Sequence, residues 1–191
     1  METLDPENGT TILLQVPDVR QSTNYSCGAA CFQAVMRYWE GEDLREGQLM
    51  ELLNTTPVDA TDPDDMVRVA EKMGLEAEIR ENLTLDDLKN SVQEGVPVIV
   101  AAQAWKYEND SWEDYENGHY MVVIGVDDRN VYLEDPSILG SRGYISRDEF
   151  VRRWHDYRDE SLSNKAREFM YPGIFIRGDR PAENPQFMYV G

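Results

Sequence analysis

The sequence changes character near Pro97, and this change limits the possible folds more than any other feature. Before Pro97, apolar residues recur at helical spacing between capping and stop signals. After it, runs of β-branched and aromatic residues alternate with turn residues. Helices that come first and strands that follow predict an α+β fold, with an N-terminal helical half packed on a C-terminal antiparallel sheet.

The length of 191 residues and the absence of repeats or low-complexity linkers predict a single domain over residues 1–191. Residues 1–10 are expected to be frayed, and 11–17 to form a short extended segment. We expect helices over 27–41, 46–54, 62–74, 85–95 and 146–157, and strands over 97–105, 119–127, 130–136 and 170–178.

Two cysteines, Cys27 and Cys31, and two histidines, His119 and His155, leave very few possible pairs of nucleophile and base. Cysteines four apart on a helix are poorly placed for a disulfide, so we interpret both as free thiols. These four residues lack the spacing of a zinc site, so we expect no metal and no cofactor. His155 falls in the expected helix 146–157 and is interpreted as a solvated helix-end residue.

Cys27 is the candidate nucleophile because it falls in the first turn of a helix that Ser26 can cap. The positive end of a helix dipole and a nearby imidazolium both favour the reactive thiolate. The small residue Gly28 would let a substrate backbone approach this helix start. The alternative is that Cys27 is only a small core residue.

His119 is the candidate base, since it opens a strand beside the Asn117-Gly118 loop. The strands 119–127 and 130–136 are separated by a polar turn and should form a hairpin that returns Asp135 to His119. A two-residue loop would put Asp135 on the face opposite His119. The pairing of Asp135 with His119 therefore requires an odd-numbered loop or a β-bulge, and the neighbouring Glu134 should point away.

Acyl transfer also needs hydrogen-bond donors for the developing oxyanion. The backbone N–H of Cys27 is one candidate. Gln21, six residues upstream in a polar loop, can supply a side-chain amide as the second. The alternative for Gln21 is an ordinary surface glutamine.

The motifs as a set resemble the papain-like cysteine peptidases that cleave bacteriocin leader peptides after a double glycine. They are Gln21, the Cys-Gly-Ala-Ala-Cys run at 27–31, Gly118-His119-Tyr120 and Asp135-Pro136. The resemblance implies a papain-like fold with the active site in the cleft between its halves. It also implies that Cys27 attacks, His119 is the base, Asp135 orients His119 and Gln21 serves the oxyanion hole.

Gly118 and Tyr120 flank the expected base and are candidate substrate-binding residues, as is Gly28. The acidic, aromatic segment 105–117 is either a lid that contacts a peptide through Trp105 and Trp112, or a solvated loop covering the sheet edge. Leader-processing enzymes of this kind are usually fused to a membrane exporter with an ATP-binding cassette, and we expect this chain to be a stand-alone form.

The charge balance of 37 acidic against 18 basic residues disfavours nucleic acid as a partner and is compatible with a basic peptide. No apolar run has the length of a membrane span, and the N-terminus lacks the features of a signal peptide, so we expect a cytoplasmic protein. Two alternatives stay open: an acyl-transfer enzyme acting on another amide, and a non-catalytic peptide-binding module of the same fold.

Overall fold

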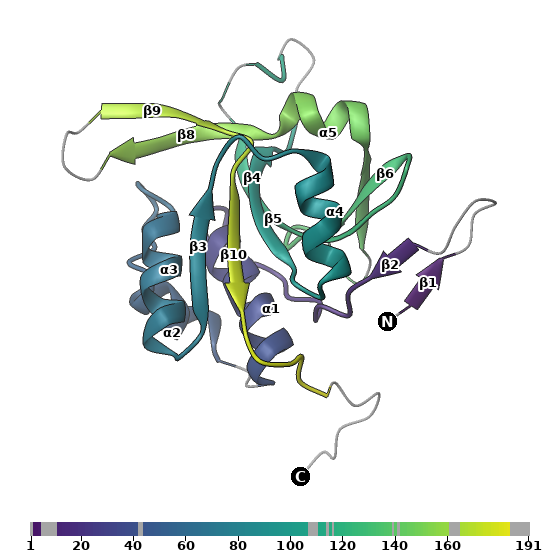
Figure 1. The fold of residues 1–191 in the computed structure, drawn as a ribbon. Coiled ribbons are helices and arrows are strands. Elements are labelled where there is room, and N and C mark those ends of the chain that lie inside the picture. Colours follow the sequence, from purple (N-terminus) through teal and green to yellow (C-terminus); the bar gives the residue numbers. More distant parts are fainter. Residues whose placement is uncertain are drawn as a thin grey trace.

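The computed structural model describes residues 2–4, 11–41, 44–106, 111–113, 115, 117–138, 140, 142–160 and 165–183. In this part of the chain, the larger helices precede most of the sheet (Figure 1). This arrangement confirms the predicted α+β class. The helices are α1 (Cys27–Glu40), α2 (Glu46–Leu52), α3 (Pro63–Lys72), α4 (Leu85–Gln93) and α5 (Arg147–Arg153).

The main sheet has the strand order β3-β10-β4-β5-β6-β7, and every neighbouring pair is antiparallel. Strands β4 and β5 form its centre, paired from Val98↔Val123 to Gln103↔Gly118. The strands are β3 (Glu76–Arg80), β4 (Val98–Gln103), β5 (Gly118–Val126), β6 (Asn130–Glu134), β7 (Gly143–Ser146) and β10 (Gly173–Arg177).

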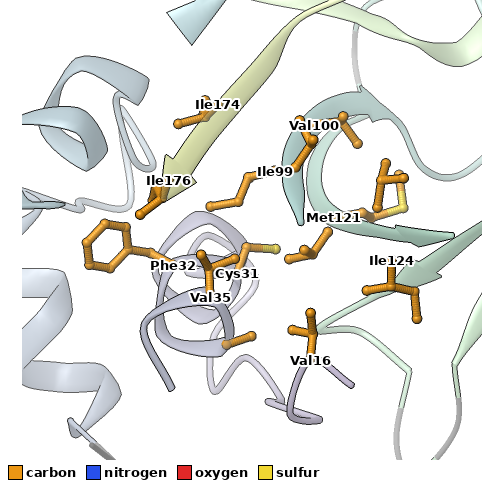
Figure 2. Packing of buried hydrophobic residues seen from close by; sticks show 14 of the residues in the cluster. Val16, Cys31, Phe32, Val35, Ile99, Val100, Met121, Ile124, Ile174 and Ile176 are labelled. Carbon is orange, nitrogen blue, oxygen red and sulfur yellow. The ribbon is translucent and has the colours of Figure 1, made fainter. Parts of the chain in front are cut away.

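Strand β4 is buried along its whole length, so both faces of the sheet centre must be covered. Helix α1 packs on one face and α4 on the other, and both contact β5 (Figure 1). On α1, small residues such as Ala30 and Ala34 are almost fully buried and let the helix approach the sheet closely. Figure 2 shows the side chains of Cys31, Phe32 and Val35 among isoleucines and valines of the strands. The thiol of Cys31 therefore belongs to the core.

The predicted end signals hold for the central helices. Asp62 caps α3, with an oxygen that accepts from the N–H of Asp64 at 2.7 Å. Thr84 and Asp87 form a reciprocal capping box at the start of α4. At the end of α1, Gly41 takes the left-handed conformation with φ of 72°, which glycine adopts at little cost. Within the described residues, none of the helices combines the length and apolar character of a bilayer-spanning segment.

The prediction of a helix over 146–157 is correct only for its first part. Helix α5 ends at Arg153, and the chain continues as β8 (His155–Glu160), which pairs with β9 (Lys165–Met170) in a separate two-stranded sheet. Tertiary contacts stop the helix: the indole of Trp154 donates to the carbonyl of Pro172 at 2.8 Å.

Strands β1, β3 and β7 were also not predicted from the sequence. Strand β3 alternates charged residues with partly buried ones, and β7 has only four residues, so neither contains an apolar run. Residues Glu2–Leu4, in the segment expected to be frayed, form β1, which pairs with β2 (Thr11–Leu13).

Candidate active site

Cys27 is the first residue of α1, and its side chain is almost completely buried, with 6% exposed. Ser26 precedes it as the N-cap but makes no side-chain bond to the helix. Its hydroxyl instead accepts from the N–H of Thr23 at 3.1 Å. The first N–H groups of an α-helix have no partner within the helix, and here the capping serine does not use them. The sulfur of Cys27 therefore sits at the positive end of a helix dipole.

His119 is the second residue of β5 and is 2% exposed. Its Nε2 lies 2.8 Å from Oδ1 of Asp135, and the side chain of Cys27 lies close enough to the ring to influence its pKa. Because Nε2 is used by Asp135, Nδ1 is the atom left for Cys27. Burial lowers the pKa of His119, but the interactions with Asp135 and Cys27 outweigh burial and raise it to about 9. The arrangement favours the imidazolium form of His119 beside the carboxylate of Asp135.

Asp135 follows β6 directly, and its carboxylate is held by Ser137 as well as by His119. Its Oδ1 accepts from the backbone N–H of Ser137 at 2.9 Å and from the Ser137 hydroxyl at 2.6 Å. Burial alone would raise the pKa of Asp135. The hydrogen bond and charge of His119, with the two bonds from Ser137, hold that pKa below its usual value. Asp135 is therefore a charged acceptor facing His119.

A β-bulge puts Asp135 on the same side as His119. The register runs Val126↔Val131 and Gly125↔Tyr132 next to the two-residue loop 128–129, then shifts to Val123↔Leu133. Ile124 is the extra residue, and its carbonyl accepts from the N–H of Leu14 at 2.9 Å.

Continuing the shifted register by one residue places Asp135 opposite Met121, two residues from His119 and on the same face. The predicted requirement for a bulge or an odd-numbered loop is therefore met by a bulge. Glu134 interacts with Asp18, Val19 and Arg142, as expected of a side chain that points away from His119.

Gln21 lies next to the turn that follows Asp135, because its backbone N–H donates to the carbonyl of Pro136 at 3.0 Å. Its side-chain Nε2 donates to the carbonyl of Thr23 at 2.6 Å. Its Oε1 is buried and has no hydrogen-bond partner among the described residues. The bond to Thr23 thus holds the side chain of Gln21 in place, and its second amide hydrogen remains available to a ligand.

Trp105 and Tyr120 surround the candidate base. The indole of Trp105 is 46% exposed, and its ring centroid lies 4.8 Å from that of His119. The Tyr120 hydroxyl donates to the carbonyl of Thr61 at 3.2 Å and so links the sheet to the helical half. Burial raises the pKa of Tyr120, and the negative charges of Asp156 and Cys27 add to the effect. Both aromatic residues are therefore close to the reacting groups.

The two candidate glycines have packing roles. A Cβ added to Gly28 would come within 2.7 Å of Cβ of Thr61, so its bare backbone packs on the segment before α3. The expected role of Gly28 in substrate approach stays a prediction. A Cβ at Gly118 would lie 2.3 Å from Oδ2 of Asp156. Gly118 therefore makes room for a carboxylate from β8.

Trp112 lies over the guanidinium of Arg153, whose central carbon is 4.4 Å from the ring centroid. Tyr115 stacks on Tyr157, with ring centroids 4.3 Å apart. Trp112 and Tyr115 thus pack against α5 and β8. Residues 107–110, 114 and 116 of the segment 105–117 lie outside the described part of the chain.

Sequence reasoning missed the contribution of β8. Burial raises the pKa of Asp156 to about 6, although the N–H of Tyr157 donates to its carboxylate at 2.8 Å and lowers this pKa. Arg158 forms an ion pair with Asp64 at the start of α3 and so joins the hairpin to the helical half. These residues were assigned to a surface helix, and residues 155–160, with charges at most positions, give no sequence signal for a strand.

His155 was interpreted as a solvated residue, and this was wrong. It is 5% exposed, and its ring centroid lies 4.3 Å from that of Tyr115. Its Nδ1 is buried without a hydrogen-bond partner in the described ranges.

Burial, followed by the charge of Cys27, raises the pKa of Cys31 well above its usual value. In the part of the chain that the structure describes, no group of cysteines, histidines and carboxylates is arranged to hold a metal ion.

A thiol at a helix start that meets a histidine and a carboxylate from an antiparallel sheet is the arrangement of a papain-like cysteine peptidase. The chain belongs to the Peptidase_C39 like family, which matches it over residues 13–162. This membership supports a cysteine peptidase activity in general.

Two relatives match more than two thirds of this chain. An uncharacterised protein of Methanothermobacter marburgensis is 32% identical over 135 residues, which are 70% of this chain and 80% of that protein. The probable functional amyloid protease FapD of Pseudomonas fluorescens is 29% identical over 146 residues. That match covers 72% of this chain but only 56% of FapD.

Solved structures share the fold at low sequence identity. The peptidase domain of Streptococcus ComA, a bifunctional ABC transporter of a quorum-sensing pathway, has a TM-score of 0.60 at 21% identity and covers 84% of this chain and 97% of that one. A C39-like peptidase from Bacillus anthracis has a TM-score of 0.62 at 17% identity, covering 89% and 98%. A double glycine motif protease of an AMS/PCAT transporter, solved with its leader peptide, has a TM-score of 0.58 at 19% identity, covering 87% and 96%.

Proposed function

We propose that this chain is a peptidase that hydrolyses a peptide bond through Cys27, His119 and Asp135. One observation carries the proposal. His119 is bonded at 2.8 Å to Asp135 through Nε2, and Cys27, at the start of α1, lies close enough to the same ring to raise its pKa. A thiolate needs this combination of a helix dipole and an imidazolium to be nucleophilic near neutral pH.

In the first half of the reaction, the Cys27 thiolate attacks the carbonyl carbon of the scissile bond. The charge that develops on the carbonyl oxygen meets the N–H of Cys27 and the free amide hydrogen of Gln21. The His119 imidazolium gives its proton to the leaving nitrogen, which departs as an amine and leaves a thioester on Cys27.

In the second half, His119 takes a proton from water, which attacks the thioester carbon. The acid product leaves, and the sulfur departs as thiolate beside the reprotonated imidazole. Asp135 holds the ring so that Nδ1 faces sulfur throughout, and it stabilises the imidazolium form.

We propose a peptide as the substrate, since solved neighbours with this fold are peptidases and one is in complex with a leader peptide. Gly118, Tyr120 and Trp105 lie beside His119 and would contact that peptide. The net charge of −19 makes basic peptides the first to test.

The test is a peptide-library cleavage screen of the wild type against Cys27→Ala, with Cys31→Ala as the matched control. We expect cleavage by the wild type and the Cys31 variant and none by the Cys27 variant. Iodoacetamide labelling at mildly acidic pH adds a second readout, in which Cys27 should react rapidly and Cys31 should not. Slow, equal labelling of both thiols would instead favour a non-catalytic peptide-binding module.

A further inference from the structure

Asp156 is a half-buried carboxylate of β8 that the proposed chemistry does not use. A Cβ added to Gly118, the residue before His119, would lie 2.3 Å from Oδ2 and 2.7 Å from Oδ1 of Asp156. Both carboxylate oxygens therefore lie against the bare backbone of Gly118. A side chain at position 118 would occupy this space, so glycine lets the carboxylate approach to within one residue of the candidate base.

The carboxylate of Asp156 has no cationic partner among the described residues. Its Oδ1 accepts from the N–H of Tyr157 at 2.8 Å. Arg158, two residues further along β8, is paired instead with Asp64 at the start of α3. Burial raises the pKa of Asp156 to about 6, because the carboxylate has lost part of its hydration. A cation supplied by a ligand would therefore be stabilised at this position.

The position of Asp156 is connected to the nucleophile through Tyr120. Gly118 and Tyr120 lie on the same face of β5, because side chains two residues apart on a strand share a face. The Tyr120 hydroxyl donates to the carbonyl of Thr61 at 3.2 Å, and Cβ of Thr61 packs against the backbone of the glycine that follows Cys27. This row of contacts leads from the carboxylate of Asp156 to the start of α1.

We propose that Asp156 is a specificity-determining residue, which binds a lysine or arginine side chain of the peptide close to the scissile bond. The inference rests on the proposed function, because that function places the peptide over Cys27 and beside His119. The aliphatic part of the basic side chain can pack on an aromatic ring such as Tyr120, while its charged end reaches the carboxylate. This contact is local, whereas the net charge of −19 attracts cations to the whole molecule.

The test uses pools of short peptides of uncharged residues that carry one lysine, or norleucine in its place, and mass spectrometry locates each cleavage. Norleucine keeps the apolar side chain and lacks the charge. We expect kcat/KM of the wild type to favour lysine by about 10- to 100-fold at one distance from the scissile bond. Asp156→Asn should reduce this preference to less than about threefold, and kcat/KM for the norleucine pools should change by less than about threefold.

Asp148→Asn is the matched control, because it removes an exposed carboxylate of α5 and changes the net charge by the same amount. Its lysine preference should equal that of the wild type. An unchanged preference in Asp156→Asn would overturn the proposal. A preference of equal size at every distance from the scissile bond would overturn it too, since the net charge alone would produce that pattern.

The pH dependence of the wild type is a second measurement, which does not require a variant to fold. Lysine stays charged between pH 5 and 7, whereas Asp156 gains its charge as pH rises through about 6. The neighbouring Tyr115 and Tyr120 have raised pKa values and stay neutral over this interval, and Arg158 stays charged and paired with Asp64. The lysine preference should therefore be small at pH 5 and large at pH 7. A preference that is constant over this interval would contradict the role of Asp156.

Peptide affinity separates this inference from the peptidase proposal. The same pools are titrated against Cys27→Ala, which lacks the nucleophile. Binding that favours lysine, without cleavage by the wild type, would sink the peptidase proposal and keep the role of Asp156. Cleavage without a lysine preference at any position would do the opposite. Pools that are neither bound nor cleaved would overturn both.

Discussion

His119 near the start of β5 and His155 at the start of β8 are similarly buried, and each ring lies against an aromatic side chain. The two neighbouring strand ends nevertheless give their histidines different partners. Nε2 of His119 is bonded to Asp135 and the ring lies close to Cys27, whereas Nδ1 of His155 is unpartnered among the described residues. At His119, the interaction with the carboxylate of Asp135 outweighs burial and favours the imidazolium. The partners of a histidine, and not its burial or place on a strand, make it a candidate base.

Replacing the two histidines in turn is the strongest way to break this comparison. His119→Ala should lower kcat/KM by about a thousandfold, because it removes proton transfer and thiolate activation together. His155→Ala should change kcat/KM by less than about threefold, while lowering the free energy of unfolding by roughly 1–3 kcal/mol through lost packing against Tyr115. Peptide cleavage and urea denaturation of both variants are the measurements. Equal losses of activity in the two folded variants would contradict the assignment of the base.

Asp135→Asn tests whether the carboxylate sets the charge state of His119. We expect kcat/KM to fall by about 10- to 100-fold and the alkaline limb to move to lower pH, because the amide cannot stabilise the imidazolium. Ser137→Ala is the matched control, since it removes one bond to Asp135 and leaves its charge. Its pH profile should stay close to that of the wild type. An unshifted profile for Asp135→Asn would show that another group charges the ring.

The pH dependence of stability sharpens the comparison further. The folded pKa of His119, about 9, is above its ordinary value of 6.5. Its stabilising contribution is thus fully present below pH 6.5 and is lost as pH rises through 9, a difference on the order of a few kcal/mol. Burial raises the pKa of Glu134 to about 8, so unfolding is measured in the Glu134→Gln background, which removes that overlapping titration. Unfolding should show the loss there, and the loss should disappear when His119→Gln is added. His155→Gln in the same background should leave the loss unchanged.

Trp105 and Trp112 provide the smallest expected contrast. The Trp105 ring lies on the imidazole of His119, whereas Trp112 lies on Arg153. A cation beside an aromatic face is stabilised by about 0.5–1 kcal/mol at an exposed site. Trp105→Ala should therefore lower the alkaline limit of activity by less than about one pH unit, and Trp112→Ala should leave it in place. Alkylation of Cys27 as a function of pH measures both.

Much of the site was predictable because its signals are local. Ser26 and Gly41 mark the ends of α1, which puts Cys27 in a first turn without any tertiary information. The hairpin of β5 and β6 follows from two apolar runs and a polar turn, and it confines Asp135 to the neighbourhood of His119. Predictions from short-range patterns of this kind agree with the folded structure because tertiary packing reinforces the local preference.

The parts that were missed depend on contacts between distant segments. The residues of β8 carry charges at most positions, and their strand conformation comes from pairing with β9. Likewise, the space at Gly28 is defined by Thr61, and the position of the bulge at Ile124 is supported by Leu14. No periodicity in the sequence reports such partners, so His155 was assigned to solvent.

The bulge at Ile124 also constrains how this protein and its relatives can vary. Paired residues of a hairpin keep their faces whatever the length of the turn, so insertions at 128–129 should leave Asp135 on the side of His119. Insertion or deletion of one residue within the paired strands, between His119 and Val126 or between Val131 and Asp135, would rotate the carboxylate to the opposite side, unless the bulge were lost at the same time. Length variation in this hairpin should therefore be found in the turn, and one-residue changes inside the strands should coincide with a straightened β5 or an inactive protein.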